Sequence, residues 1–163
     1  NFLKIQKSYL MTNLKIITIV FLTFSICFQS SYGKDVLKAK KGIIWDSENN
    51  QYIAEGDVNY LSNDIELFSQ YLKASYEIID GKEIFNEIFL DGDVKIIYNE
   101  EIYTSDNGIY NKKDQIILLN NNVEVVSEGR ILKGDELIID LEENTRTMNA
   151  SDKDSFVEVF INE

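Results

Sequence analysis

The sequence contains no histidine, no proline and a single cysteine among its 163 residues. Without histidine, and with one thiol, the common nucleophile–imidazole pairs and most zinc sites are excluded. The absence of proline suits a chain with many hydrogen-bonded strands, because each proline removes one backbone donor from a sheet. The cysteine, Cys27, lies in an apolar N-terminal stretch, so the rest of the chain is expected to hold its fold without a disulfide.

Basic residues are few compared with acidic ones, at 16 against 28, which gives a net charge of −12. Three of the lysines, Lys4, Lys7 and Lys15, belong to the N-terminal stretch. Without them, 13 basic residues face 28 acidic ones, a net charge of −15. Nucleic acids and anionic membranes carry phosphates, so this balance disfavours both as partners. It also speaks against a simple basic patch for an anionic lipid headgroup.

The N-terminal stretch has the pattern of a secretory leader. A lysine precedes the apolar run 16–28, and Ser31 and Gly33 place small residues at −3 and −1 of a cleavage site. The run is shorter than the ~20 residues that a membrane span needs. We therefore expect a signal peptide at 11–33, beginning at a methionine, and one exported domain at 34–163. The alternative is a leader that is retained as an inner-membrane anchor.

Strand patterns dominate the expected domain. Apolar or alternating runs of four to eight residues are separated by turn clusters rich in glycine and asparagine, as hairpin turns require. No stretch has a clear helical period, so little helix is expected. Strands are predicted at residues 36–46, 51–54, 58–61, 65–69, 71–79, 82–90, 94–99, 101–110, 115–119, 123–127, 131–141, 145–150 and 156–161.

One phrase recurs three times, a polar turn followed by a strand that begins with valine. It reads Glu55-Gly56-Asp57-Val58, Asp91-Gly92-Asp93-Val94 and Asn121-Asn122-Val123, with the valines 36 and 29 residues apart. Such a period indicates one supersecondary unit that is copied and stacked. The sequence therefore predicts an all-β protein of stacked, short antiparallel strands.

Glycine and aspartate recur at matching places in these repeats. Gly42 aligns with Gly108, 66 residues later, and Asp106 and Asp135 each follow a strand. We interpret these residues as corners where strands bend or bulge. A calcium loop at Asp91-Gly92-Asp93 is disfavoured, because the triplet lacks the further oxygen ligands that calcium takes. No metal and no cofactor are expected.

Apolar residues at alternate strand positions form a candidate inward face. This face is either a filled core or a trough between two sheets that do not close, in which acyl chains could bind. Carboxylates are plentiful, but none is marked as an acid–base pair, so a hydrolase is disfavoured and no catalytic residue is assigned. The candidate lipid-binding residues are Val36, Leu37, Val58, Tyr60, Ile65, Leu67, Val94, Ile96, Ile102, Val123, Val125, Ile131, Leu137 and Ile139.

The two ends of such a stack have free strand edges. The candidates are the strand near Val36 and the very apolar last strand, with Phe156, Val157, Val159 and Ile161. Either the last strand pairs within the molecule, or it adds to a strand of a neighbouring molecule and gives head-to-tail self-association.

Three features together carry a resemblance to a known family: the two Gly-Asp-Val turns, the alternating strands after them, and the segment from Ile131 through Lys133-Gly134-Asp135 to Asp140. Over about residues 36–150, the sequence resembles the OstA-like family. Asn121-Asn122 departs from the glycine usual in the third turn, which asparagine tolerates because it can adopt the left-handed conformation. The missing basic C-terminal tail and the acidic charge also depart from the family.

The resemblance implies a β-jellyroll of stacked antiparallel strands that is open at both ends and catalyses nothing. Family members hold the lipid A acyl chains of lipopolysaccharide between their sheets. They join related jellyroll domains of inner- and outer-membrane transport proteins in the periplasm and carry lipopolysaccharide to the outer membrane for its assembly. The alternatives are an inner-membrane-anchored relative of the same system and a structural β-repeat module without a lipid ligand.

Overall fold

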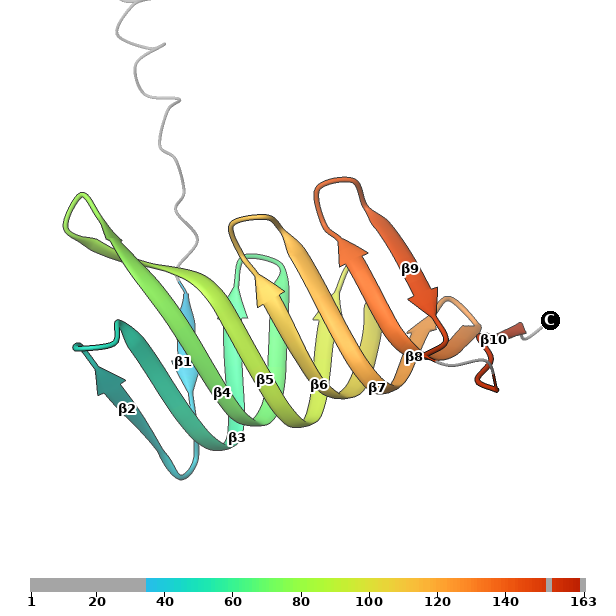
Figure 1. Cartoon of the computed structure of the whole chain (residues 1–163), viewed down its shortest axis with the longest axis horizontal. Coiled ribbons are helices and arrows are strands. Elements are labelled where there is room, and N and C mark those ends of the chain that lie inside the picture. Colours follow the sequence, from blue (N-terminus) through green and yellow to red (C-terminus); the bar gives the residue numbers. More distant parts are fainter. Residues whose placement is uncertain (1–34, 152–153, 162–163) are drawn as a thin grey trace, which may run out of the picture. The chain divides into compact units, whose positions relative to one another are not determined.

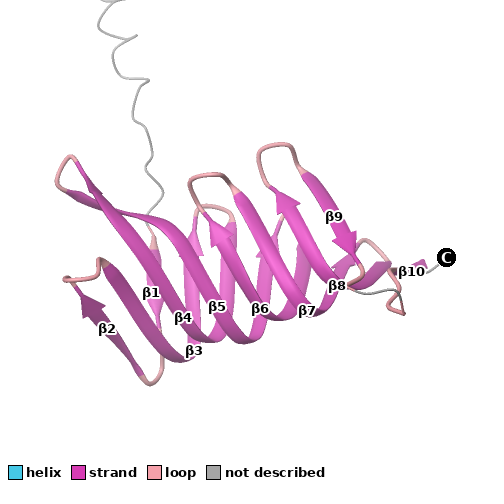
Figure 2. Ribbon diagram, in the orientation of Figure 1, coloured by secondary structure: helices cyan, strands magenta, loops and turns pink. Residues whose placement is uncertain are grey.

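The computed structural model describes residues 35–151 and 154–161, which form one antiparallel sheet of ten strands (Figure 1, Figure 2). The predicted signal peptide lies outside these residues. Among the described residues, no helix has the length and apolar character to cross a membrane. The strands are β1 (Val36–Lys38), β2 (Gly42–Asp46), β3 (Gln51–Ser62), β4 (Ile65–Ile79), β5 (Lys82–Tyr98), β6 (Glu101–Asn111), β7 (Ile116–Ser127), β8 (Arg130–Asp140), β9 (Thr145–Asn149) and β10 (Glu158–Ile161).

Neighbouring strands in the sheet are mostly neighbours in sequence. The order is β1-β3-β4-β5-β6-β7-β8-β10, with β2 also paired to β3 and β9 also paired to β8. The six long strands therefore each have two halves, and the two halves pair in separate layers. Layer A contains β2, β9 and residues 51–55, 71–79, 82–91, 107–111, 116–120 and 136–140; layer B contains β1, β10 and residues 58–62, 65–69, 94–98, 101–105, 123–127 and 130–134.

A row of corners joins the two layers along the lower margin of Figure 1. The ladder register shifts between Glu55 and Val58, between Asp91 and Val94, and between Asn120 and Val123. At each of these corners two successive residues have positive φ: 76° and 42° at Gly56-Asp57, and 75° and 51° at Gly92-Asp93. The extra residues re-aim the strand, as β-bulges do. The repeated turns are thus the bends of a folded sheet.

The third corner has no glycine but takes the same conformation. Asn121 and Asn122 have φ values of 63° and 52°, which asparagine adopts more readily than most residues. The Asn122 side chain also donates a 2.7 Å hydrogen bond to Asp106 on the adjacent corner of β6. The departure from glycine therefore leaves the geometry of the corner intact.

The strand boundaries differ from the prediction in one systematic way. Several predicted pairs of short strands, such as 51–54 with 58–61, are single long strands that pass through a corner. Conversely, the predicted strand 36–46 is two strands, β1 and β2. Its middle residues turn around the corner of β3, where the backbone N–H groups of Lys40 and Lys41 donate to the carbonyls of Gly56 and Glu55.

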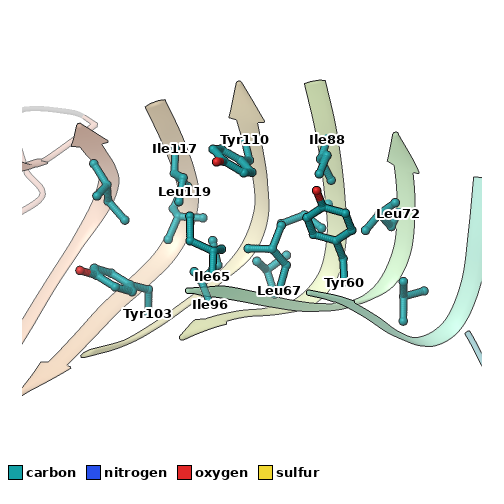
Figure 3. Close-up of a cluster of buried hydrophobic side chains, with 14 of the residues drawn as sticks. Tyr60, Ile65, Leu67, Leu72, Ile88, Ile96, Tyr103, Tyr110, Ile117 and Leu119 are labelled. Carbon is teal, nitrogen blue, oxygen red and sulfur yellow. The ribbon is translucent and has the colours of Figure 1, made fainter. Parts of the chain in front are cut away.

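The core lies between the layers, because every second residue of each half-strand points toward the other layer (Figure 3). Figure 3 shows Leu72, Ile88 and Tyr110 of layer A on the opposite side of the cluster from Tyr60 and Leu67 of layer B. The largest side chains there are fully buried, so the layers pack against each other as a filled core. The core includes Ala54, Val58, Tyr60, Leu67, Leu72, Ile88, Leu90, Ile96, Tyr103, Ile117, Leu119, Leu137 and Ile139.

Candidate functional site: the space between the two layers

Most of the residues predicted to face the interior do point into the space between the layers. Leu37 packs against the core, and ten further candidates are buried in it: Val58, Tyr60, Ile65, Leu67, Val94, Ile96, Val123, Val125, Leu137 and Ile139. Their burial shows that they line the space between the layers. Their role in lipid binding stays a prediction.

Three candidates point the other way, and their predicted orientation is wrong. Ile102 is 37% exposed, whereas Tyr103 next to it is fully buried. Directly paired residues share a face, and Tyr103 pairs with the inward Ile96. By the same reasoning Ile131, which pairs with the exposed Val126, and Val36, which pairs with the exposed Leu61, lie on the outer face.

The sequence analysis missed many inward residues of layer A, where the predicted face covered only Leu137 and Ile139. Leu72, Leu90 and Leu119 are fully buried there. The alternation itself identifies two of them, because Leu90 lies four residues before the inward Val94 and Leu119 lies four residues before the inward Val123. Leu72 departs from the alternation that Leu67 sets, because the ladder register shifts at the corner of β4.

Opposite the corners, the two layers separate at an open margin formed by their hairpins (Figure 1). All strand pairs run within a layer or around a corner, and no described backbone hydrogen bond joins the layers at this margin. Side chains alone close it. Separating the layers there requires no ladder bond to break.

One ion pair crosses the open margin near the N-terminal end of the sheet. Lys112, on the hairpin between β6 and β7 in layer A, donates to Asp35 at 2.6 and 2.8 Å. Its Nζ also lies 3.2 Å from Oη of Tyr60 in layer B. Burial raises the pKa of the Tyr60 hydroxyl, so this group stays protonated.

A second ion pair crosses the margin near the C-terminal end. Arg146 of β9 donates to one carboxylate oxygen of Glu101 at 2.6 and 2.9 Å, and Nε lies 3.1 Å from Oη of Tyr103. Tyr103 donates its own proton to Glu101. Burial alone would raise the pKa of Glu101, but the hydrogen bonds from Tyr103, Ser127 and Arg146 outweigh it and hold this pKa below its usual value.

A half-open cavity of about 440 Å³ lies beside this second ion pair, between the layers. Its polar rim is formed by Asn99, Glu101, Ser127, Arg130, Asn144 and Arg146. Its apolar floor is formed by Val125, Leu132, Leu137 and Met148. No group of acidic, histidine or cysteine side chains among the described residues could hold a metal ion.

The two ends of the sheet are apolar. Among the described residues, β10 pairs with β8 alone, and its Val159 and Ile161 are 54% and 69% exposed. Phe156 and Val157, just before β10, are exposed as well. At the other end, Ile43 and Trp45 of β2 are exposed although they pair with the inward residues Ala54 and Tyr52. The interior face therefore continues to both ends of the described sheet.

Comparisons with known proteins agree with this geometry. A family model described as "LptA/(LptD N-terminal domain) LPS transport protein" matches residues 32–145, more than half of the chain. The crystal structure of LptH, the LptA homologous periplasmic component of the lipopolysaccharide transport device from Pseudomonas aeruginosa, has a TM-score of 0.66. It is 10% identical in sequence, and the match covers 80% of this chain and 96% of LptH. No curated protein matches the sequence.

The LptH match shows a shared fold, which confirms the predicted jellyroll of antiparallel strands, and the family match confirms the OstA-like resemblance. The chain therefore belongs to the family of LptA and the LptD N-terminal domain, whose members are lipopolysaccharide transport proteins and not enzymes.

Proposed function

We propose that this protein acts in the periplasm, binds the acyl chains of lipopolysaccharide between layers A and B, and hands the lipid from the inner toward the outer membrane. The observation that carries the proposal is the open margin, where side chains alone hold the layers together. Membership of a family described as lipopolysaccharide transport proteins supports lipopolysaccharide as the cargo.

Lipid entry between the layers is physically reasonable. The layers are joined at the corners, so they can spread at the open margin while each half-strand keeps its ladder bonds. Spreading exposes core side chains, which costs free energy. Acyl chains that take their place recover about 0.8 kcal/mol for each methylene group removed from water. A ligand with several acyl chains offers many such groups.

The exposed inward residues at both ends support head-to-tail assembly. Ile43 and Trp45 at one end, and Val159 and Ile161 at the other, leave the apolar interior uncapped. A second copy, or a related jellyroll domain of an inner- or outer-membrane transport protein, would cover these residues and extend the interior. In the described part of the chain, β10 and β2 each pair on one side, so their other edges supply backbone groups for strand addition.

The filled core favours one other candidate, a structural β-repeat module that binds no lipid. Native mass spectrometry of the exported protein, purified from cells that make lipopolysaccharide, separates the two. Lipid transport predicts adducts with the mass of lipid A or lipopolysaccharide. A bare protein mass that persists after lipopolysaccharide is added would favour the structural module.

Val159→Arg is expected to weaken head-to-tail assembly. The substitution places a charge on the exposed, inward-facing position of β10, where a neighbouring jellyroll would have to bury it. Sedimentation velocity over a range of protein concentrations should show long oligomers for the wild type and mostly short species for the variant. Ile102→Arg, at an exposed position on the outer face of β6 in the middle of the strand order, is the control. Unchanged oligomers in Val159→Arg would remove β10 from the interface.

A further inference from the structure

The chain has only two arginines, Arg130 and Arg146, against fourteen lysines, and both line the same cavity. They come from different layers: Arg130 begins β8 in layer B, and Arg146 lies in β9 of layer A. Their positions in the ladders place both on inward faces, because Arg130 pairs with Ser127 and Arg146 pairs with the buried Ile139. Among the residues that the structure describes, no lysine lines this cavity.

The two guanidinium groups differ in what they already bind. Arg146 is held in place by Glu101, by Tyr103 and by both the backbone and the side-chain oxygen of Asn144. Arg130 makes no ion pair with any described residue. The guanidinium of Arg146 is thus fixed in orientation, whereas the guanidinium of Arg130 is available to a ligand.

Charge at the cavity has the opposite sign to charge on the protein. The described residues of the rim carry a net charge of +1, from two arginines and Glu101, in a chain whose net charge is −12. The acidic composition argued against a basic patch, yet the side chains that line this cavity form a site with a local net positive charge. A guanidinium is a planar donor that matches phosphate and carboxylate oxygens, and its interaction strengthens when the site is partly shielded from water.

Below the rim the cavity is apolar. Val125 and Leu137 are buried, and Leu132 and Met148 pack against the same core. The floor therefore opens directly onto the space between the layers. A ligand that carries an anionic group next to an acyl chain fits both parts of the cavity at once.

We propose that this cavity is the anionic-headgroup site of the protein, where Arg130 and Arg146 bind the phosphate of an acylated ligand while its acyl chains enter between the layers. The inference rests on the proposed lipid-binding function. It adds a defined position for the charged end of the ligand. It places the headgroup at the C-terminal part of the open margin, near β9 and β10.

The test compares diphosphoryl lipid A, the same lipid after enzymatic removal of its phosphates, and hexadecanoate. Binding to the full exported protein is measured by displacement of a fluorescent apolar probe. Arg130→Gln is the main variant, because removing the Arg130 guanidinium leaves no buried carboxylate among the described residues without its ion-pair partner. It should bind diphosphoryl lipid A about tenfold more weakly, as expected for the loss of one charge-assisted hydrogen-bonding group, and bind dephosphorylated lipid A as well as the wild type does.

Two control variants sharpen the comparison. Lys73→Gln removes one positive charge from the outer face of β4 and should leave all three affinities unchanged. Arg130→Lys keeps the charge but loses the planar fork, so it should recover only part of the affinity. A tenfold loss that appears for hexadecanoate as well would identify the site as one for anions in general, which still supports the inference.

The remaining outcomes overturn it in distinguishable ways. If lipid A binds with equal affinity before and after dephosphorylation, and Arg130→Gln changes neither, the protein binds lipid but the headgroup does not lie at the two arginines. If none of the three lipids displaces the probe, the proposed lipid-binding function fails, and the headgroup site fails with it.

Discussion

Leu119→Ala is expected to lower the free energy of unfolding by about 2–5 kcal/mol, the range for a leucine removed from a close-packed core. Leu119 is fully buried in β7, where it pairs with Gly108 on one side and Leu137 on the other. The loss has two sources. The apolar surface of the missing atoms is no longer buried, and the surrounding strands close only partly on the cavity, because their ladder bonds fix their spacing.

Urea denaturation followed by circular dichroism measures this change. Leu118→Ala is the matched control, since Leu118 lies next to Leu119 on the same strand, points to the outer face and is only partly buried. We expect the control to cost less than about 1 kcal/mol. Equal losses for the two variants would mean that the space between the layers is not the core of this protein.

Gly108→Val is expected to destabilise the protein by at least about 1–3 kcal/mol, the usual cost of overpacking. A Cβ atom added at Gly108 would lie 2.6 Å from Cδ2 of Leu119 and 3.1 Å from the backbone oxygen of Leu118. The first contact requires a buried leucine to move, and the second requires the backbone of β7 to move. Neither has free space, since Leu119 is fully buried.

Gly42 provides the control for this substitution, because it aligns with Gly108 in the repeat. A Cβ atom at Gly42 would meet nothing within 4 Å. Gly42→Val should therefore leave the unfolding free energy nearly unchanged, or raise it slightly through the preference of valine for strands. Thermal unfolding of both variants distinguishes the two positions. Similar melting temperatures for the two would show that the close packing at Gly108 has no consequence for stability.

The corners were the part of the fold best predicted from sequence. Two consecutive residues with positive φ are costly for most side chains, so the composition of each turn reveals its geometry. Gly56-Asp57 and Gly92-Asp93 carry this signal directly. Asn121-Asn122 indicates a positive φ more weakly than glycine does, and the third corner was predicted from its spacing in the repeat as well.

The error at Ile102 has a definite physical origin. The alternation Ile102-Tyr103-Thr104 is compatible with either face, and hydrophobicity alone favours isoleucine as the buried residue. The ladder with β5 decides otherwise, because Tyr103 pairs with Ile96. Tyrosine is tolerated inside because its hydroxyl reaches Glu101 and Arg146 at the open margin.

The charged groups at the open margin could not be predicted from local patterns. Lys112 meets Asp35 across 77 residues of sequence, and Arg146 meets Glu101 across 45. These contacts depend on which hairpins of layers A and B face one another, which is a property of the folded sheet. The one local clue was that the chain contains just two arginines, 16 residues apart, at the start of β8 and in β9.

The most direct measurement is site-specific photo-crosslinking to lipopolysaccharide in cells at two neighbouring positions of β7. Val125 points between the layers and is 5% exposed, whereas Val126 points outward and is 38% exposed. A photoreactive amino acid at position 125 should form a covalent adduct with lipopolysaccharide, and one at position 126 should not. Adducts at position 126 alone, or at both positions equally, would contradict lipid binding between the layers.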